Sequence, residues 1–203
     1  MKKLFLSLTG AALMSVALVS CDKTPDVAGT WKINPQTFSM KDVSLASSTD
    51  CVTMTPDAES GKKGKIVINS TVAIDANASI APMAPVYRVE ITTPVSVEGT
   101  WMFSDSDDDD IICNLDMSTM SVDVKAENLE FAPVGPLSVK QDDIDRLRPY
   151  VISTYQTSLT KEMALYYTRY NKLEDIKVID NALTCEMHIS DIAGDKDMVW
   201  TKE

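Results

Sequence analysis

A run of acidic side chains, Asp105-Ser-Asp-Asp-Asp-Asp110, has the composition of a cation site. Calcium-binding loops place carboxylates at their first, third and fifth positions, and Asp105, Asp107 and Asp109 have that spacing. Such loops also need a glycine at the sixth position for a sharp turn, where this chain has Asp110. Two interpretations therefore stay open: a solvated hairpin tip, or a weak Ca²⁺ site formed by Asp105, Asp107 and Asp109.

The single histidine, His188, is the residue best suited to proton transfer near neutral pH. It lies on the polar face of an alternating segment, opposite Cys185 and Met187. Nothing in the sequence places a serine or cysteine nucleophile beside it, and no spacing singles out a pair of carboxylates for glycoside hydrolysis. We therefore expect an exposed surface histidine and a protein that is not an enzyme and needs no cofactor.

The N-terminal residues have the pattern of an export signal. Two lysines precede an apolar run over residues 4–19, which is too short for a lasting membrane span. The run ends in Leu18-Val19-Ser20-Cys21, which resembles the lipobox of bacterial lipoproteins. The resemblance implies a signal peptide over residues 1–20 and acylation of the Cys21 thiol, followed by a lipidated tether over residues 21–28. Acyl chains contribute about 0.8 kcal/mol per buried CH₂, so two or three of them give a stable anchor.

The residue after the lipobox bears on localisation. In some Gram-negative bacteria an aspartate in the position of Asp22 retains a lipoprotein in the inner membrane, whereas other lineages ignore that rule. We expect a lipid-anchored protein of the cell envelope, with the outer membrane favoured and the leaflet left open.

The charge balance excludes one class of partner. The net charge is −11, and it becomes −13 when the two lysines of the signal peptide are removed. Nucleic-acid binding needs clusters of Lys and Arg, which the chain lacks, so we expect no nucleic-acid partner. The acidity favours a cationic protein partner.

Three cysteines follow Cys21, at positions 51, 113 and 185. Their separations match no zinc site. In an oxidising envelope one pair of Cys51, Cys113 and Cys185 could form a disulfide; we expect instead that each is a small apolar residue in a strand.

Strand periodicity dominates the middle of the chain. Apolar residues alternate with polar ones over residues 65–75 and 87–103, as in half-buried strands. Pro94 lies inside the second segment and predicts a break or a sheet edge, because it has no N–H to donate. Gly99 predicts a bend or a place of close packing.

The pattern continues after the acidic run. Odd-numbered positions stay apolar as far as Met117, and even-numbered positions take over from Met120. A change of parity predicts a bulge or tight turn near residues 118–119. Three more strands are predicted, at Ile176–Asp180, Leu183–Ile189 and Met198–Lys202. Short local connections favour an antiparallel meander.

One helix is predicted over residues 142–173, where apolar residues recur at steps of three and four. Pro149 is expected either to start the main helix or to kink a longer one. The segment holds five of the six tyrosines. A tyrosine-rich face is typical of packing with hydroxyls at the rim, and less often it lines a ligand pocket or plugs the mouth of a barrel.

A family resemblance follows from the start of the domain. The segment Val27-Ala28-Gly29-Thr30-Trp31 is similar to the Gly-x-Trp entrance of lipocalins and of lipocalin-like lipoproteins of the kind common in Bacteroidota. The strand and helix patterns predict a mainly β fold with one long helix (α+β) in a single domain over residues 29–203, and the resemblance implies that its sheet is an antiparallel β-barrel or half-barrel. It also implies that Trp31 closes the barrel floor against a basic residue, for which Lys202 is the candidate.

The sequence is compatible with two functions. The first is a membrane-anchored binding module, holding a small hydrophobic ligand in the barrel or presenting the barrel surface. The alternative is an acidic protein-interaction module without a ligand cavity, such as an envelope inhibitor or accessory subunit. A barrel of about eight strands can either fill its interior with side chains or enclose one ligand, so the pattern alone leaves both open.

Overall fold

The computed structural model describes residues 24–41, 43–82, 84–136, 140–189 and 195–203. The predicted signal peptide and Cys21 lie outside these residues. The elements, in chain order, are β1 (Gly29–Ile33), β2 (Gln36–Phe38), β3 (Val43–Pro56), β4 (Lys63–Ser79), β5 (Val86–Phe103), β6 (Ile111–Val122), the 3₁₀ helix η1 (Ala126–Asn128), β7 (Leu129–Pro133), α1 (Gln141–Tyr166), the 3₁₀ helix η2 (Tyr167–Tyr170), β8 (Lys172–Ile179), β9 (Ala182–His188) and β10 (Asp195–Lys202).

The strands form one antiparallel sheet whose ends meet. The order β1-β10-β9-β8-β6-β5-β4-β3 closes on itself because β1 pairs with β3 as well as with β10. The short strands β2 and β7 are attached to β3 and β5 outside this ring. The predicted mainly β fold with one long helix and a barrel-like sheet is confirmed.

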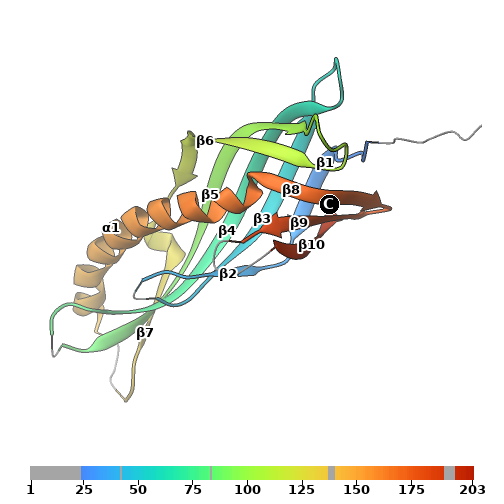
Figure 1. Ribbon diagram of the computed structural model, residues 1–203. Helices are drawn as coiled ribbons and strands as arrows, with labels where there is room; N and C mark the ends of the chain where they lie inside the picture. The colour runs from blue at the N-terminus through green and yellow to red at the C-terminus, as the bar shows by residue number, and fades with distance from the viewer. Residues whose placement is uncertain (1–23, 42, 83, 137–139, 190–194) are drawn as a thin grey trace, which may run out of the picture.

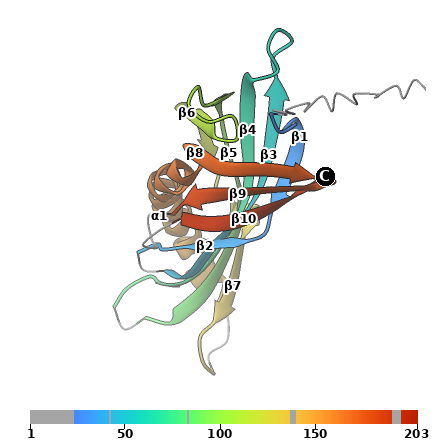
Figure 2. The ribbon, with the colours of Figure 1, turned by 45° about the vertical axis from the view of Figure 1, so that its right-hand side comes forward.

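The long strands and the late strands form different walls of the ring. Strands β3, β4 and β5 run along the length of the molecule, whereas β8, β9 and β10 run across them (Figures 1 and 2). Helix α1 lies against the sheet and is fixed to the end of β6, where Gln156 donates to the carbonyl of Val122 (2.5 Å) and accepts from the N–H of Val124 (2.9 Å). Within the described residues, no helix combines the length and the apolar character that crossing a bilayer requires.

The core follows the predicted alternation. The apolar side chains that alternate along β4 and β5 are buried, and so is the apolar stripe of α1. Three tryptophans and two tyrosines are among the largest fully buried side chains: Trp31, Trp101, Trp200, Tyr167 and Tyr170. The interior of the ring is therefore packed with aromatic and aliphatic side chains.

Pro94 does not break its strand. Strand β5 is continuous and pairs with β4 along its whole length, so the predicted break is wrong. On the other edge of β5, the pairing with β7 ends at Ile91 and the pairing with β6 begins at Val95. Pro94 lies in the gap between these two pairings. Pro94 therefore lies at a local edge of the sheet on that side, the second of the two predicted positions, where proline is tolerated.

The parity change in β6 is a bulge, as predicted. Ser96 pairs with Ser121 and Glu98 pairs with Asp116, so four residues of β6, 117–120, lie opposite the single residue Val97 of β5. The N–H of Glu98 donates to the hydroxyl of Thr119 at 2.9 Å, which replaces a ladder bond.

The helix ends earlier than the predicted residue 173. α1 ends at Tyr166, η2 ends at Tyr170, and β8 begins at Lys172. Leu173 fits the helical stripe by spacing, but it is buried as a strand residue paired with Ile111 and Met187. Pro149 lies inside α1, which continues through it.

The two ends of the domain meet at Trp31. Its partner across the β1–β10 ladder is Lys202, whose ammonium lies 5.2 Å from the centre of the indole ring. Gly29 leaves room for this lysine: a Cβ there would lie 2.9 Å from Lys202 Cε, and its φ of 127° suits glycine.

Val27, in the predicted tether, is buried, and its backbone carbonyl accepts a hydrogen bond from the Trp31 indole N–H at 2.8 Å. Packing therefore begins two residues before the predicted domain start.

Gly99 permits close contact between β5 and β6, as predicted. A Cβ on Gly99 would lie 2.4 Å from the backbone oxygen of Asn114. We expect Gly99→Ala to lower the free energy of unfolding by about 1–3 kcal/mol, because the two strands would have to separate. Urea denaturation measures this, with the exposed neighbour Thr100→Ala as the control that changes stability by less than about 0.5 kcal/mol. Equal stability of the two variants would contradict the close packing.

Candidate functional site

A buried carboxylate, Asp50 on β3, is the most unusual polar feature of the interior. It is fully inaccessible to solvent. Four hydroxyls donate to it over 2.5–2.7 Å: those of Ser48 and Ser70 to Oδ1, and those of Tyr166 and Tyr170 to Oδ2. The hydroxyl of Tyr167 joins the network through Ser70 at 2.9 Å.

The tyrosines stay protonated in this network. Burial, and next the Asp50 carboxylate, raise the pKa of Tyr166 and of Tyr170 well above the ordinary value, while burial raises that of Tyr167. A protonated phenol can donate a hydrogen bond to a carboxylate. Hydrogen bonds to a charged group are about twice as strong as those between neutral groups. The arrangement therefore satisfies a buried charge and fixes the end of α1 and η2 to β3 and β4.

The tyrosine-rich segment was thus interpreted correctly as packing, but its hydroxyls are placed differently from the prediction. Those of Tyr166, Tyr167 and Tyr170 point into the interior instead of the rim. Asp50 was not predicted as a site residue. Its position in an alternating segment could have indicated burial. The residues that share the buried face of β3 are Ala46, Ser48, Asp50, Val52 and Met54.

One cation lies on the outer side of this network. The guanidinium of Arg169 is 3.6 Å from the centre of the Tyr166 ring, and its Nε donates to the carbonyl of Tyr166 at 3.0 Å. Phe38 packs against the same ring with centroids 5.2 Å apart. Tyr166 therefore separates a buried negative charge, Asp50, from a buried positive charge.

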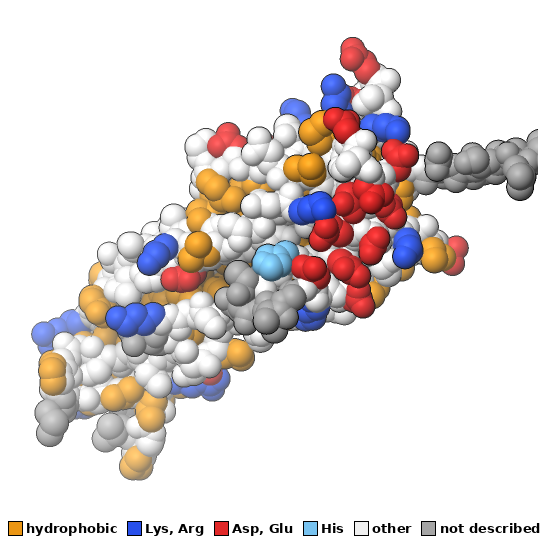
Figure 3. Space-filling model, in the orientation of Figure 1, with side chains coloured by type: hydrophobic (Ala, Val, Ile, Leu, Met, Phe, Trp, Pro, Cys, Tyr) orange, Lys and Arg blue, Asp and Glu red, His pale blue; other side chains and the backbone are white. Residues whose placement is uncertain are grey.

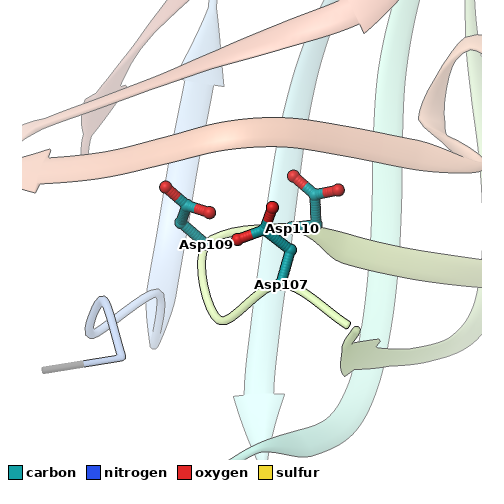
Figure 4. A group of neighbouring side chains, drawn as sticks. All are labelled: Asp107, Asp109 and Asp110. Carbon is teal, nitrogen blue, oxygen red and sulfur yellow. The ribbon is translucent and has the colours of Figure 1, made fainter. Parts of the chain in front are cut away.

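The acidic run forms the loop between β5 and β6, as one of the two interpretations expected. Carboxylate oxygens of Asp107, Asp109 and Asp110 lie within 4.8 Å of one another, whereas Asp105 is not part of this group (Figure 4). Contact with Asp109, by hydrogen bond and charge, raises the pKa of Asp107. The predicted Ca²⁺ site at Asp105, Asp107 and Asp109 stays a prediction.

Asp110 also has a structural role. Its carboxylate forms an ion pair with Lys172 at 2.9 Å and accepts the N–H of Asp175 at 3.3 Å. The carbonyl of Asp109 accepts the N–H of Ile176 at 2.9 Å. These bonds attach the loop to β8, next to the irregularity between Glu174 and Lys177 in the β8–β9 pairing.

A row of acidic residues crosses the outer face of the late strands. Glu174 on β8 lies directly opposite Glu186 on β9, and Glu186 lies opposite Asp197 on β10. Acidic side chains gather over this part of the molecule (Figure 3). We call Glu174, Glu186 and Asp197, with Asp175 and Asp195 beside them, the acidic face. Partial burial, and next the charges of Asp175 and Asp197, raise the pKa of Glu186.

His188 lies at the edge of the acidic face. Its side chain is exposed, and Nδ1 lies 3.1 Å from a carboxylate oxygen of Asp195. The prediction of an exposed histidine is confirmed.

The three cysteines in the described residues are free thiols on strands. Burial raises the pKa of Cys113 and of Cys185 to about 12, so both are unreactive apolar residues at neutral pH. Cys51 is partly exposed, and its thiol lies 3.7 Å from a carboxylate oxygen of Glu203. The expectation of small strand residues holds for Cys113 and Cys185.

Comparison with known proteins adds no functional lead: no family model matches the chain, and neither does any curated protein.

We expect the hydroxyl network around Asp50 to contribute to the stability of the protein. We expect Tyr170→Phe to lower the free energy of unfolding by about 1.5–3 kcal/mol, because a bond to a buried charge is lost. Tyr150→Phe, on the exposed side of α1, should leave stability within about 0.5 kcal/mol. Chemical denaturation of both variants is the measurement. Equal stabilities would mean that the Tyr170 hydroxyl does not support Asp50.

We expect the acidic face to lower the stability of the folded protein. A raised pKa in the folded state means that ionised Glu186 opposes folding at neutral pH, and that this penalty disappears as pH falls below the pKa. We therefore expect Glu186→Gln to raise the melting temperature at pH 7 and low salt, with a smaller gain at pH 4 and in high salt. Glu127→Gln, away from the face, is the control. A lower melting temperature for Glu186→Gln at pH 7 would contradict the repulsion.

Proposed function

We propose that this protein is a lipid-anchored envelope module that binds a cationic protein partner through the acidic face. The observation that carries the proposal is the alignment of Glu174, Glu186 and Asp197 directly opposite one another on three neighbouring strands. Like charges in directly opposed positions destabilise a sheet. Lys172 forms an ion pair with Glu174, whereas Glu186 and Asp197 have no ion pair within the described residues, so a basic partner would offset their repulsion.

Two exposed apolar residues complement the charges. Val199 on β10 is 55% exposed, and Ile179 at the end of β8 is 69% exposed. An interface generally combines apolar contacts with a polar rim. A basic segment that also carries apolar side chains fits this surface.

The position of the chain start favours a partner at the membrane. Thr24 and Pro25 line a surface hollow together with Asp107, Asp108 and Asp109, close to β8. Cys21 lies three residues before Thr24, and three extended residues span at most about 11 Å. An anchor on Cys21 would thus keep this end of the domain near the headgroups. Anionic lipids would repel it, and a basic protein segment would not.

The alternative, a carrier for a small hydrophobic ligand, needs space inside the ring. Three tryptophans are completely or almost completely buried there, and the observed packing gives the carrier no support beyond the resemblance. It stays a prediction that native mass spectrometry of the purified protein tests.

The proposed interface can be tested by photo-crosslinking in cells. A photoreactive amino acid in place of Val199 should capture a basic envelope protein, whereas the same residue in place of Tyr150 on α1 should not. Capture should fall when Glu174, Glu186 and Asp197 are changed to Gln, Gln and Asn. It should also fall in isolated membranes at high ionic strength, because exposed charges are screened.

The matched control removes three charges elsewhere. Glu98, Glu127 and Glu130 are exposed and lie outside the acidic face. Changing all three to Gln should leave capture at Val199 unaffected. Equal loss in both triple variants would point to net charge alone, and capture that resists salt would oppose the proposal.

A further inference from the structure

Arg169 is the one residue of η2 that carries a positive charge, and 92% of its surface is buried, since it is 8% exposed. Burial of a charge is costly unless an opposite charge or several hydrogen bonds compensate it. Its contacts in the described residues are the Tyr166 ring and one hydrogen bond from Nε to the Tyr166 carbonyl. No carboxylate of the described residues forms an ion pair with it. Within the described residues, its two terminal nitrogens form no side-chain hydrogen bond or ion pair.

These nitrogens belong to a side chain that lines a surface hollow of about 380 Å³. The other described lining residues are Gln36, Thr37, Phe38, Ser39, Ile189 and Lys196. Lys196 supplies a second positive charge, and its ammonium donates to the side-chain amide oxygen Oε1 of Gln36 at 3.2 Å. Phe38 and Ile189 supply an apolar wall.

The charge of this hollow is opposite to that of the chain. Acidic residues number 30 against 19 basic ones, yet none of the described lining residues is acidic. The described lining residues carry two cations and no anion, in a protein of net charge −11, which favours an anion in the hollow.

We propose that this hollow binds a small oxyanion, a carboxylate or phosphate group, with Arg169 and Lys196 as its ligands. The planar guanidinium presents two parallel N–H donors that match a carboxylate or phosphate, and stacking on Tyr166 holds the plane in place. A short apolar part of the ligand would lie against Phe38 and Ile189. The site is separate from the acidic face and does not depend on the function proposed for it.

Isoleucine-methyl NMR of the full-length lipoprotein in phosphatidylcholine nanodiscs tests the site, with inorganic phosphate and butyrate as probes. The Ile189 methyl signal should shift and saturate at a probe concentration on the order of 1–10 mM. The signal of Ile66, buried on β4, should not shift. Adding phosphatidic acid to the disc separates the sources: a shift without soluble probe indicates a lipid headgroup, and a shift with soluble probe alone indicates a free anion.

Two matched lysine variants each remove one charge, and a third variant changes the shape of the arginine donor. Lys196→Gln should weaken probe binding about threefold to tenfold, and Lys177→Gln, outside the hollow, should not change it. Arg169→Lys keeps the charge but loses the paired donors, and it should weaken phosphate and butyrate alike. A purely structural Arg169, bonded to the Tyr166 carbonyl and stacking on the Tyr166 ring, would give no saturable Ile189 shift with any probe. That result, or equal binding by the two lysine variants, would overturn the proposal.

Discussion

The interaction on which the structure depends is the set of hydroxyl bonds to Asp50. An ionised carboxylate in the interior without partners would cost several kcal/mol. Ser48 and Ser70 approach it from the sheet, and Tyr166 and Tyr170 approach it from the end of the helical segment. Because donors from separate parts of the chain must converge on one side chain, the network specifies where α1 ends and how η2 enters the ring.

Closure of the ring places the remaining features. Strand β1 pairs with both β3 and β10, so the two ends of the domain are adjacent. Lys202 covers Trp31 at this junction, next to Gly29, whose φ of 127° favours glycine. The contact predicted from the lipocalin resemblance is present, although the family itself stays a prediction. Closure also brings β8, β9 and β10 beside the loop between β5 and β6, which concentrates the acidic residues at one end.

Alternation in the sequence was sufficient for much of the fold. In β4 and β5 one face is almost wholly apolar, so the period of two is visible, and the bulge in β6 showed as a change of parity. Strand β3 was not predicted, because its buried face includes Ser48 and Asp50 and its pattern is mixed. The helix boundary was missed for a related reason: Leu173 continues a helical spacing while belonging to a strand.

The candidate sites were the least predictable part, since each depends on residues distant in the sequence. Asp107 and Asp109 are close in sequence, so their proximity could be expected from the sequence alone. Glu174, Glu186 and Asp197 are distant in sequence and are brought side by side by the register of β8, β9 and β10. Arg169 meets Lys196 only because β10 returns beside η2 and β2. The two sites also differ energetically. Like charges aligned on β8–β10 reduce stability, and a buried arginine adds a further cost; the Asp50 network and the aromatic core offset both. The two partners that we propose, of opposite charge, would each offset one of these costs.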